Sequence, residues 1–451
     1  MSSARVTVRD RSGRVHLVYP KNWGFVEESC QVYDTYSTDD GATWSPVYDV
    51  SRHGNLCSTG PALAMDSSGT LHCTWFQFWD TIVGKYDYFY SKTLNDTWTT
   101  PVNISRMATN TNYAEYSCIC ADNRGGIHVV FEYSPGPDIY YTRPSGDSWL
   151  TPTRISTSPR DDGFPSIASD SRGTLHACWR LRGSDSGYVM YSRYDTAWLP
   201  PLRLAAFPTG MNCAMLAVGS DDVVHIACAG DVPTGKNDVF YMKNSGDTWT
   251  NPENISSTPQ TQSLAPQIGV KDEKTLCAVW TEEMQDGPPQ TMCRFLVDGN
   301  WLPPVNLSDD TLRGAGLCQI ASQVQGGRAD VFWAGRMSRD ACDFYDTTCI
   351  YMLGVSFPSG GVAERFREPG GSAPVASKRT LATGIDAREF PPGTHVQVYD
   401  AGGRCVRGFG RVISGQVDRN DDLTMRLNPG VYFLCIVGGE LKQVSRIVIV
   451  N

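Results

Sequence analysis

A unit of about 50 residues recurs along the chain and limits the possible folds more than any other feature. Its clearest copy is YTRPSGDSWLTPTRIS at residues 141–156, and similar units begin at Tyr36, Tyr90 and Tyr241. The repeated tryptophans are 54, 51, 49, 51 and 52 residues apart: Trp44, Trp98, Trp149, Trp198, Trp249 and Trp301. A serine follows five of them by seven residues, and Ala205 replaces it after Trp198. Repetition at this period predicts a β-propeller in which each unit is one four-stranded blade.

A second repeated element precedes each tryptophan unit. It reads PALAMDSSGTLHCTW at 61–75 and PSIASDSRGTLHACW at 165–179. Two alternating apolar stretches joined by a short Asp/Ser/Gly turn predict a β-hairpin. A seventh copy at 319–333 has no tryptophan unit after it, and strands at 350–357 and 362–366 would complete its blade. We therefore predict an all-β protein with a seven-bladed β-propeller. A six-bladed propeller with one extra hairpin is the alternative.

The repeat stops near residue 367 of the 451 residues. We predict a propeller at 1–367, a linker rich in Pro and Gly at 368–378 and a small Ig-like β-sandwich at 379–451. The net charge is −9 without a basic cluster, which argues against nucleic acid as a partner. No apolar run is long enough to span a membrane, and the start MSSARVTVRD lacks the apolar segment of a signal peptide.

The chain has fifteen cysteines, a high and odd number. We predict that four of them, which lie in strand-like apolar stretches, are buried and unpaired: Cys73, Cys178, Cys228 and Cys277. Disulfides remain open between Cys342 and Cys349 or between Cys405 and Cys435, because sequence does not determine pairing. No Cys or His cluster has the spacing of zinc ligands, so we predict no metal, and we predict no cofactor.

The segment STDDGATW at residues 37–44 matches the Asp-box pattern S-x-D-x-G-x-T-W. On this motif and its eroded copies, residues 5–366 resemble the sialidase-like, Asp-box (BNR-repeat) β-propeller superfamily. The resemblance implies that the box is a structural turn between the third and fourth strands of a blade. Asp39 can accept backbone N–H bonds there, Gly41 can supply a positive φ, and Trp44 can pack between blades. The box therefore informs on the fold and carries no catalytic information.

A histidine occupies the same position in five of the predicted hairpins: His16, His72, His128, His176 and His225. Side chains repeated around a ring lie too far apart to converge on one metal or one substrate. We predict that these histidines are structural hydrogen-bonding residues.

The loops between the second and third strands vary in length, and we expect function there. Because successive strands are antiparallel, these loops and the blade-to-blade loops share one face, opposite the Asp-box turns. Stretches on this loop face include 21–28, 77–85, 106–116, 160–162 and 180–182. Their aromatic, arginine and acidic side chains suit sugars, since rings stack on C–H faces and polar groups bind hydroxyls. The candidate ligand-binding residues are Trp23, Trp79, Asp80, Tyr113, Glu115, Arg160, Arg180 and Arg182.

Our first functional hypothesis is a module that recognises a glycan or a cell surface. The alternative is a sialidase-like glycoside hydrolase or a polysaccharide lyase, and a purely structural surface protein is the third. The family resemblance implies an arginine triad for the substrate carboxylate, a Tyr/Glu nucleophile pair and an Asp acid/base. The Arg-Ile-Pro signature expected in the first blade is missing, and Arg5-Val6-Thr7 stands in its region. We therefore assign no catalytic residue.

The C-terminal region resembles the sorting domain of type IX secretion substrates. The stretches that carry this resemblance are VQVYDAGGRCVRGF at 396–409, LNPGVYFLCIVGG at 427–439 and the terminal KQVSRIVIVN. The resemblance implies the type IX machinery as a partner and an extracellular or outer-surface location on a bacterium. It would also explain the missing signal peptide by a lost or trimmed N-terminus. A plain Ig-like accessory sandwich is the alternative.

Overall fold

The computed structural model describes most side chains from Arg5 to Trp333, and after that only the backbone of strands up to Ile449. Within the first part it leaves out residues 22–29, 40, 42, 53–56, 81–84, 107–115, 134–136, 209, 246–247, 259, 286, 309–314 and 321–327. All regular elements of the described chain are β-strands, so the predicted all-β class is confirmed.

The described strands up to Arg367 form seven successive sheets. The first three sheets contain β1 (Thr7–Arg9), β2 (Val15–Lys21), β3 (Gln31–Ser37) and β4 (Tyr48–Asp49); β5 (Ser58–Met65), β6 (Leu71–Asp80), β7 (Lys85–Leu94), β8 (Thr97–Trp98) and β9 (Val102–Asn103); and β10 (Ser117–Ala121), β11 (Ile127–Tyr133), β12 (Asp138–Thr142) and β15 (Thr153–Arg154). Beside the third sheet, β13 (Pro144–Ser145) and β14 (Ser148–Trp149) pair with each other.

The next three sheets repeat this order. They contain β16 (Asp162–Ser169), β17 (Leu175–Arg182), β18 (Gly187–Tyr194) and β19 (Leu202–Phe207); β20 (Met211–Val218), β21 (Val224–Asp231), β22 (Asn237–Ser245), β23 (Thr248–Trp249) and β24 (Glu253–Asn254); and β25 (Gln262–Asp272), β26 (Thr275–Glu283), β27 (Gln290–Val297), β28 (Asn300–Trp301) and β29 (Val305–Asn306). The seventh sheet begins with β30 (Ala315–Ile320), β31 (Arg328–Arg336), β32 (Thr348–Ser356) and β33 (Val362–Arg367).

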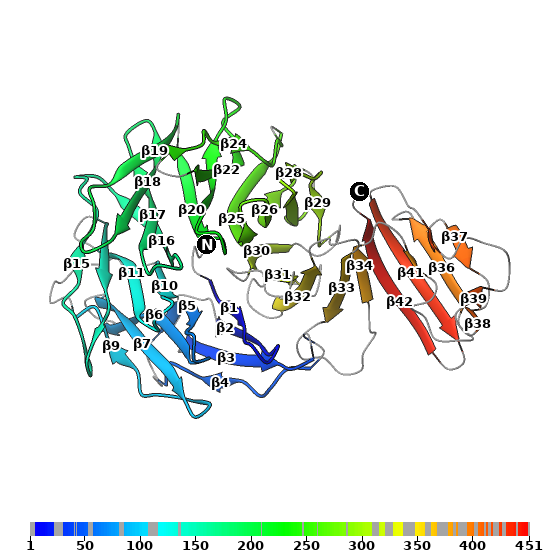
Figure 1. Ribbon diagram of the computed structural model, residues 1–451, viewed down its shortest axis with the longest axis horizontal. Helices are drawn as coiled ribbons and strands as arrows, with labels where there is room; N and C mark the ends of the chain where they lie inside the picture. The colour runs from blue at the N-terminus through cyan, green and yellow to red at the C-terminus, as the bar shows by residue number, and fades with distance from the viewer. Residues whose placement is uncertain are drawn as a thin grey trace.

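The sheets are arranged around a ring, with the first strand of each on the inner side (Figure 1). The last sheet meets the first, because Phe332 of β31 packs with Val15 and Leu17 of β2. Next to this contact, the Arg9 guanidinium donates to the two carboxylate oxygens of Asp330 at 2.6 and 3.0 Å. The chain therefore forms a β-propeller, as predicted, whereas the count of seven blades stays a prediction.

The core is divided into layers between neighbouring sheets. In one layer, Cys178 and Val189 of the fourth sheet pack against Leu216, Ile226 and Cys228 of the fifth. Each strand thus presents apolar side chains to both neighbouring blades, which explains the near-continuous burial of the inner strands.

The serine that follows each tryptophan by seven residues joins the fourth strand to the third. In five sheets its Oγ accepts a third-strand N–H, as Ser105 does from Tyr88 at 2.9 Å. The same hydroxyl donates to a side chain at the start of the third strand, and Ser256 bonds Asp238 in this way at 3.1 Å. Ala205 in β19 cannot make these bonds.

Four of the five repeated histidines form the predicted structural hydrogen bonds, whereas Nδ1 of His16 has no hydrogen-bond partner among the described residues. In these four Nδ1 lies 2.7 or 2.8 Å from a tyrosine hydroxyl of the third strand: His72, His128, His176 and His225. Burial lowers the pKa of these four histidines. The tyrosine in turn packs against the tryptophan of the next repeat, with 4.7 Å between the ring centroids of Tyr90 and Trp149. These ring contacts connect successive blades.

The Asp-box segment forms the expected turn. Asp39 Oδ1 accepts the Thr43 N–H at 2.8 Å, Ser37 Oγ accepts the Gly41 N–H at 2.7 Å, and Gly41 has a φ of 84°. Trp44 packs edge-on against Phe332, with 6.3 Å between their rings, and so lies between the first and last sheets.

The cysteine predictions are partly borne out. Cys73, Cys178, Cys228 and Cys277 are buried and free, as predicted. The structure contains a disulfide that the sequence analysis missed, between Cys30 and Cys57, which join the first two sheets. The two pairings left open were Cys342 with Cys349 and Cys405 with Cys435. The side chains of these four cysteines lie outside the described residues.

The seventh sheet continues into the C-terminal strands. Its order is β30-β31-β32-β33, then β34 (Lys378–Leu381), β42 (Leu441–Ile449), β41 (Gly430–Gly438), β36 (His395–Asp400) and β37 (Cys405–Phe409). Two short pairs accompany it: β35 (Ile385–Asp386) with β40 (Thr424–Met425), and β38 (Val412–Ile413) with β39 (Gln416–Val417). Strand pairing between β33 and β34 therefore crosses the predicted linker, and the division into domains stays a prediction.

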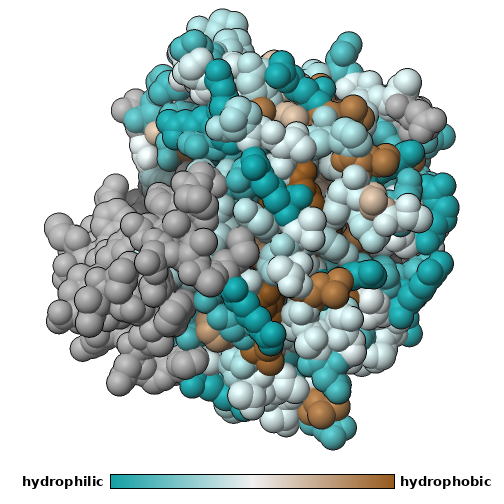
Figure 2. Space-filling model, turned by 90° about the vertical axis from the view of Figure 1, so that its left-hand side faces the viewer, coloured by the Kyte–Doolittle hydropathy of each residue, from teal (hydrophilic) through white to brown (hydrophobic). Residues whose placement is uncertain are grey.

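The outer side of the ring that carries β15 and β19 is covered mainly by hydrophilic side chains, with apolar ones dispersed among them (Figure 2). The exposed apolar residues include Leu150, Leu199 and Leu202. In the part of the chain that the structure describes, no helix is long and apolar enough to cross a membrane.

Candidate functional site

The first strand of five sheets contains a β-bulge near its loop-face end. In three of these bulges the residue before a proline has a positive φ: Gly60 (61°), Phe164 (55°) and Ala265 (49°). A positive φ is unfavourable for a residue as large as phenylalanine, and such strain concentrates at functional positions. Bulges also redirect side chains beside active sites. Phe164 is therefore a strained backbone position on the loop face.

Two side chains contact the Phe164 ring. Tyr116, just before β10, stacks on it with 4.0 Å between ring centroids and 25° between ring planes. The Arg180 guanidinium carbon, from β17, lies 4.4 Å from the centroid of the same ring. The third and fourth blades thus together form a cluster of two aromatic rings and a cation, which we call the Phe164 cluster.

Arg180 is half-buried, and its hydrogen bonds do not use its full capacity. Its Nη1 donates to the Asn212 carbonyl at 3.4 Å, whereas its buried Nε has no acceptor among the described residues. Burial lowers its pKa, and the nearby Glu132 carboxylate opposes that shift. A guanidinium with unused donors can bind a carboxylate or two neighbouring hydroxyls.

Two buried carboxyl groups belong to the same region. Glu132, only 4% exposed on β11, accepts the Phe164 N–H at 3.3 Å. Asp162, 1% exposed at the start of β16, accepts the Trp179 Nε1–H at 2.8 Å through Oδ1, while its Oδ2 has no hydrogen-bond partner among the described residues. Burial raises the pKa of Asp162 to about 7. A carboxyl group with such a pKa is partly protonated at neutral pH and can deliver or take up a proton.

The structure brings one of the eight predicted site residues, Arg180, into this cluster. Arg160 and Arg182 lie in the same blade with exposed side chains. Trp79 and Asp80 lie at the end of β6, and their side chains are outside the described residues. Trp23, Tyr113 and Glu115 also lie outside the described residues.

Four residues of this region were not among the predicted ones: Tyr116, Glu132, Asp162 and Phe164. Tyr116 and Asp162 lie inside the predicted stretches 106–116 and 160–162, but nothing in the sequence singles them out there. Glu132 had a usable signal, since it places a charge inside the buried strand IHVVFEY. Among the described side chains, no group of three His, Cys, Asp or Glu could hold a metal ion.

No family model matches this sequence, and no curated protein is similar to it. Solved structures are similar in fold. A polysaccharide lyase, the PL25 ulvan lyase bound to -[GlcA(1-4)Rha3S]-, superposes with a TM-score of 0.55 at 12% identity, over 77% of this chain and 91% of that chain. The lectin BP39L from Burkholderia pseudomallei superposes with a TM-score of 0.54 at 13% identity, over 79% and 97% of the two chains. This chain has a β-propeller fold.

A sialidase is also similar, but more loosely. The Hadza microbial sialidase Hz136 aligns at 16% identity over 62% of this chain and 64% of that chain, with a TM-score of 0.43. That superposition is too loose to bear on the fold. At the identities of the lyase and the lectin, the likeness concerns the fold alone.

Proposed function

We propose that this protein recognises glycans through the loop face of its propeller, at the Phe164 cluster. The observation that carries the proposal is the Arg180 guanidinium, held 4.4 Å from the Phe164 ring with an Nε that has no acceptor among the described residues. Aromatic rings bind the C–H faces of sugars, and a guanidinium binds their hydroxyl or acid groups in a fixed geometry. The positive φ of Phe164 is a strained backbone conformation. Such conformations are concentrated at binding sites, where the surrounding structure maintains them.

The likeness to solved structures supports a carbohydrate ligand. One similar structure is named a polysaccharide lyase and another a lectin, so this fold serves both sugar cleavage and sugar binding. Fold does not by itself determine function, and the argument therefore depends on the Phe164 cluster.

A glycan array tests the proposal. The full chain should bind a defined set of glycans, and the Arg180→Ala variant should lose at least tenfold in affinity for them. Arg124→Ala is the control, because Arg124 is exposed in the turn between β10 and β11 on the opposite face. Equal binding by the chain and by Arg180→Ala would contradict the proposal.

A second candidate function is a glycoside hydrolase or polysaccharide lyase at the same face. The observation that favours it is the buried Asp162 carboxyl, whose pKa is raised to about 7. A proton donor in this range suits the acid step of glycosidic bond cleavage. Sugar release from polysaccharides should then fall about 100-fold or more in Asp162→Asn, in line with the usual contribution of general acid catalysis. If the unchanged protein binds polysaccharides but releases no sugar from them, recognition is its function.

We propose in addition that the chain is exported to the bacterial cell surface or the medium. The type IX sorting resemblance of 396–451 and the Asp-box resemblance of 37–44 support this view. The Cys30–Cys57 disulfide fits an oxidising compartment. A chain truncated before residue 379 should no longer be exported from a host that has type IX secretion. Export of the truncated chain at the normal level would refute the sorting role.

A further inference from the structure

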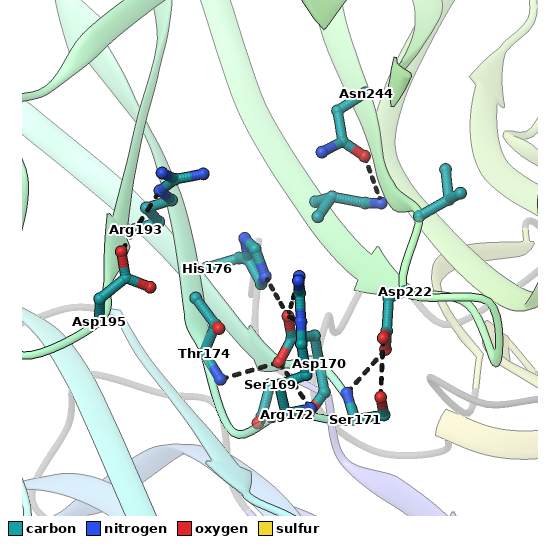
Figure 3. Close-up of polar contacts among 12 residues, drawn as sticks. Ser169, Asp170, Ser171, Arg172, Thr174, His176, Arg193, Asp195, Asp222 and Asn244 are labelled. Carbon is teal, nitrogen blue, oxygen red and sulfur yellow. Dashed lines mark hydrogen bonds and ion pairs between the residues drawn. The ribbon is translucent and has the colours of Figure 1, made fainter. Parts of the chain in front are cut away.

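A cavity lies on the turn face of the propeller, opposite the loop face. It has a volume of about 500 Å³ and lies between the fourth and fifth sheets. Its walls are formed by Arg172, Thr174, His176, Tyr191, Arg193, Asp195, Asp222 and Asn244. The volume is in the range of small-molecule sites. Figure 3 shows Arg193 and Asp195 on one side, Asp222 and Asn244 on the other, and His176 between them.

The fourth blade differs from the second at the turn that borders this cavity. The residue opposite the repeated histidine is Lys92 in β7 and Arg193 in β18. From Lys92 to the following tryptophan the distance is six residues, and from Arg193 to Trp198 it is five. The turn of the fourth blade is therefore one residue shorter than that of the second.

The His176 ring borders this cavity, and its Nε2 is turned toward a buried aspartate. In the second and third blades, the histidine Nε2 lies 3.2 Å from an aspartate of the hairpin turn. In the fourth blade, Arg172 donates to Asp170 Oδ2 at 2.8 and 3.1 Å, and the distance from His176 Nε2 to this oxygen is 3.7 Å. His176 is only 4% exposed, and its Nε2 has no hydrogen-bond partner among the described residues. A buried polar nitrogen without a partner costs free energy unless a ligand or water satisfies it.

The Tyr191 hydroxyl determines what this nitrogen offers. It lies 2.7 Å from Nδ1, as the tyrosine hydroxyls do in the blades where Nε2 faces a carboxylate. In those blades Nε2 must carry the proton, so Nδ1 accepts from the hydroxyl. With the same tautomer, the His176 Nε2–H points toward Asp170 Oδ2, and the ring borders the cavity beside Tyr191.

The charges of the walls point to a neutral ligand with many hydroxyls. The lining includes two guanidiniums, of Arg172 and Arg193, and two carboxylates, of Asp195 and Asp222. The opposite charges alternate along the walls, with Arg193 Nε 3.8 Å from Asp195 Oδ2. Hydroxyls suit such alternation because each one both donates and accepts. An anion is disfavoured because a carboxylate lies beside each guanidinium. A zwitterion is disfavoured because it would need the positive and the negative groups on separate walls.

We propose that this cavity between the fourth and fifth blades is a second binding site, for a neutral saccharide. Arg193 and Asn244 donate to sugar oxygens, and Asp195 accepts from a hydroxyl. The site is independent of the Phe164 cluster, which lies at the opposite ends of the strands. It would allow one propeller to hold a glycan on each face.

Saturation-transfer NMR on the full chain tests the site with four probes: D-glucose, D-galactose, D-mannose and D-xylose at millimolar concentration. At least one sugar should bind, and Arg193→Ala should weaken that binding at least tenfold. Asn244→Asp should weaken it similarly, because it keeps the Oδ1 that accepts the Val224 N–H at 2.8 Å and removes the amide donor. Lys92→Ala is the matched control from the second blade and should bind like the unchanged protein.

Arg180→Ala separates the two sites. Binding that persists in Arg180→Ala and is lost in Arg193→Ala supports the turn-face site, even if the loop face binds nothing. Binding that is lost only in Arg180→Ala would assign it to the loop face and overturn the inference. Absence of binding for all four sugars, or stronger binding of glycine than of any sugar, would also overturn it.

Discussion

At the scale of single residues, Asp162 links stability to pH. Its pKa is raised to about 7 by burial, so the folded state holds the proton more tightly than the unfolded state. The folded protein is therefore stabilised below the ordinary carboxyl pKa and loses that advantage as pH rises to about 7. Asp162→Asn keeps an acceptor for Trp179 and removes the ionisation. Its stability relative to the unchanged protein should rise between pH 4 and 7.5, by up to about 4 kcal/mol.

Urea unfolding at several pH values measures this difference. A stability difference that stays constant with pH would show that Asp162 is ionised in the folded protein at all these values.

The buried cysteines give a second prediction for single residues. Burial raises the pKa of the Cys73 and Cys178 thiols well above the ordinary value, so little reactive thiolate is present. Cys73, Cys178, Cys228 and Cys277 should resist a thiol reagent in the native protein and react after unfolding. Mass spectrometry of labelled peptides checks this, and rapid native labelling of any of the four would contradict it.

At the scale of elements, each blade depends on the serine between its third and fourth strands. Ser105→Ala leaves the buried Tyr88 N–H without its acceptor, which should cost about 1–3 kcal/mol. The fourth blade provides the control, since Ala205→Ser inserts a hydroxyl where no such network exists and should give no comparable gain. Thermal unfolding compares the two variants, and an unchanged Ser105→Ala stability would refute the role of the hydroxyl.

The contacts between blades give a separate prediction. Trp149 packs on Tyr90 of the preceding blade, so Trp149→Ala should cost about 3–5 kcal/mol of stability and leave glycan affinity unchanged. Arg180→Ala should do the reverse. If Trp149→Ala folds normally and loses binding, the functional face has been assigned wrongly.

At the scale of the whole molecule, closure of the ring depends on contacts between its two ends. The Arg9–Asp330 pair joins β1 to β31 and is 12% and 3% exposed. Removing one partner of a buried pair costs about 3–5 kcal/mol, because the other charge stays buried. Asp330→Ala should therefore lower stability by about this amount, and Arg9→Ala with Asp330→Ala should cost less than the sum of the two single changes. Additive costs would show that the pair does not couple the ends of the ring.

The fold class, the repeat and the structural roles of the histidines and the Asp-box residues could be predicted from the sequence. This was possible because these residues act within one blade or between neighbours: a histidine bonds the tyrosine of the adjacent strand, and the Asp-box side chains bond their own turn. The tertiary structure alone decided which side chains meet from different blades. Glu132 meets Phe164 and Arg180 only because β11 of the third sheet lies beside β16 and β17 of the fourth, and Phe164 is set by a bulge that no local pattern specifies. The longer distance from His176 Nε2 to Asp170 is likewise invisible in the repeat, since it depends on which oxygen Arg172 occupies.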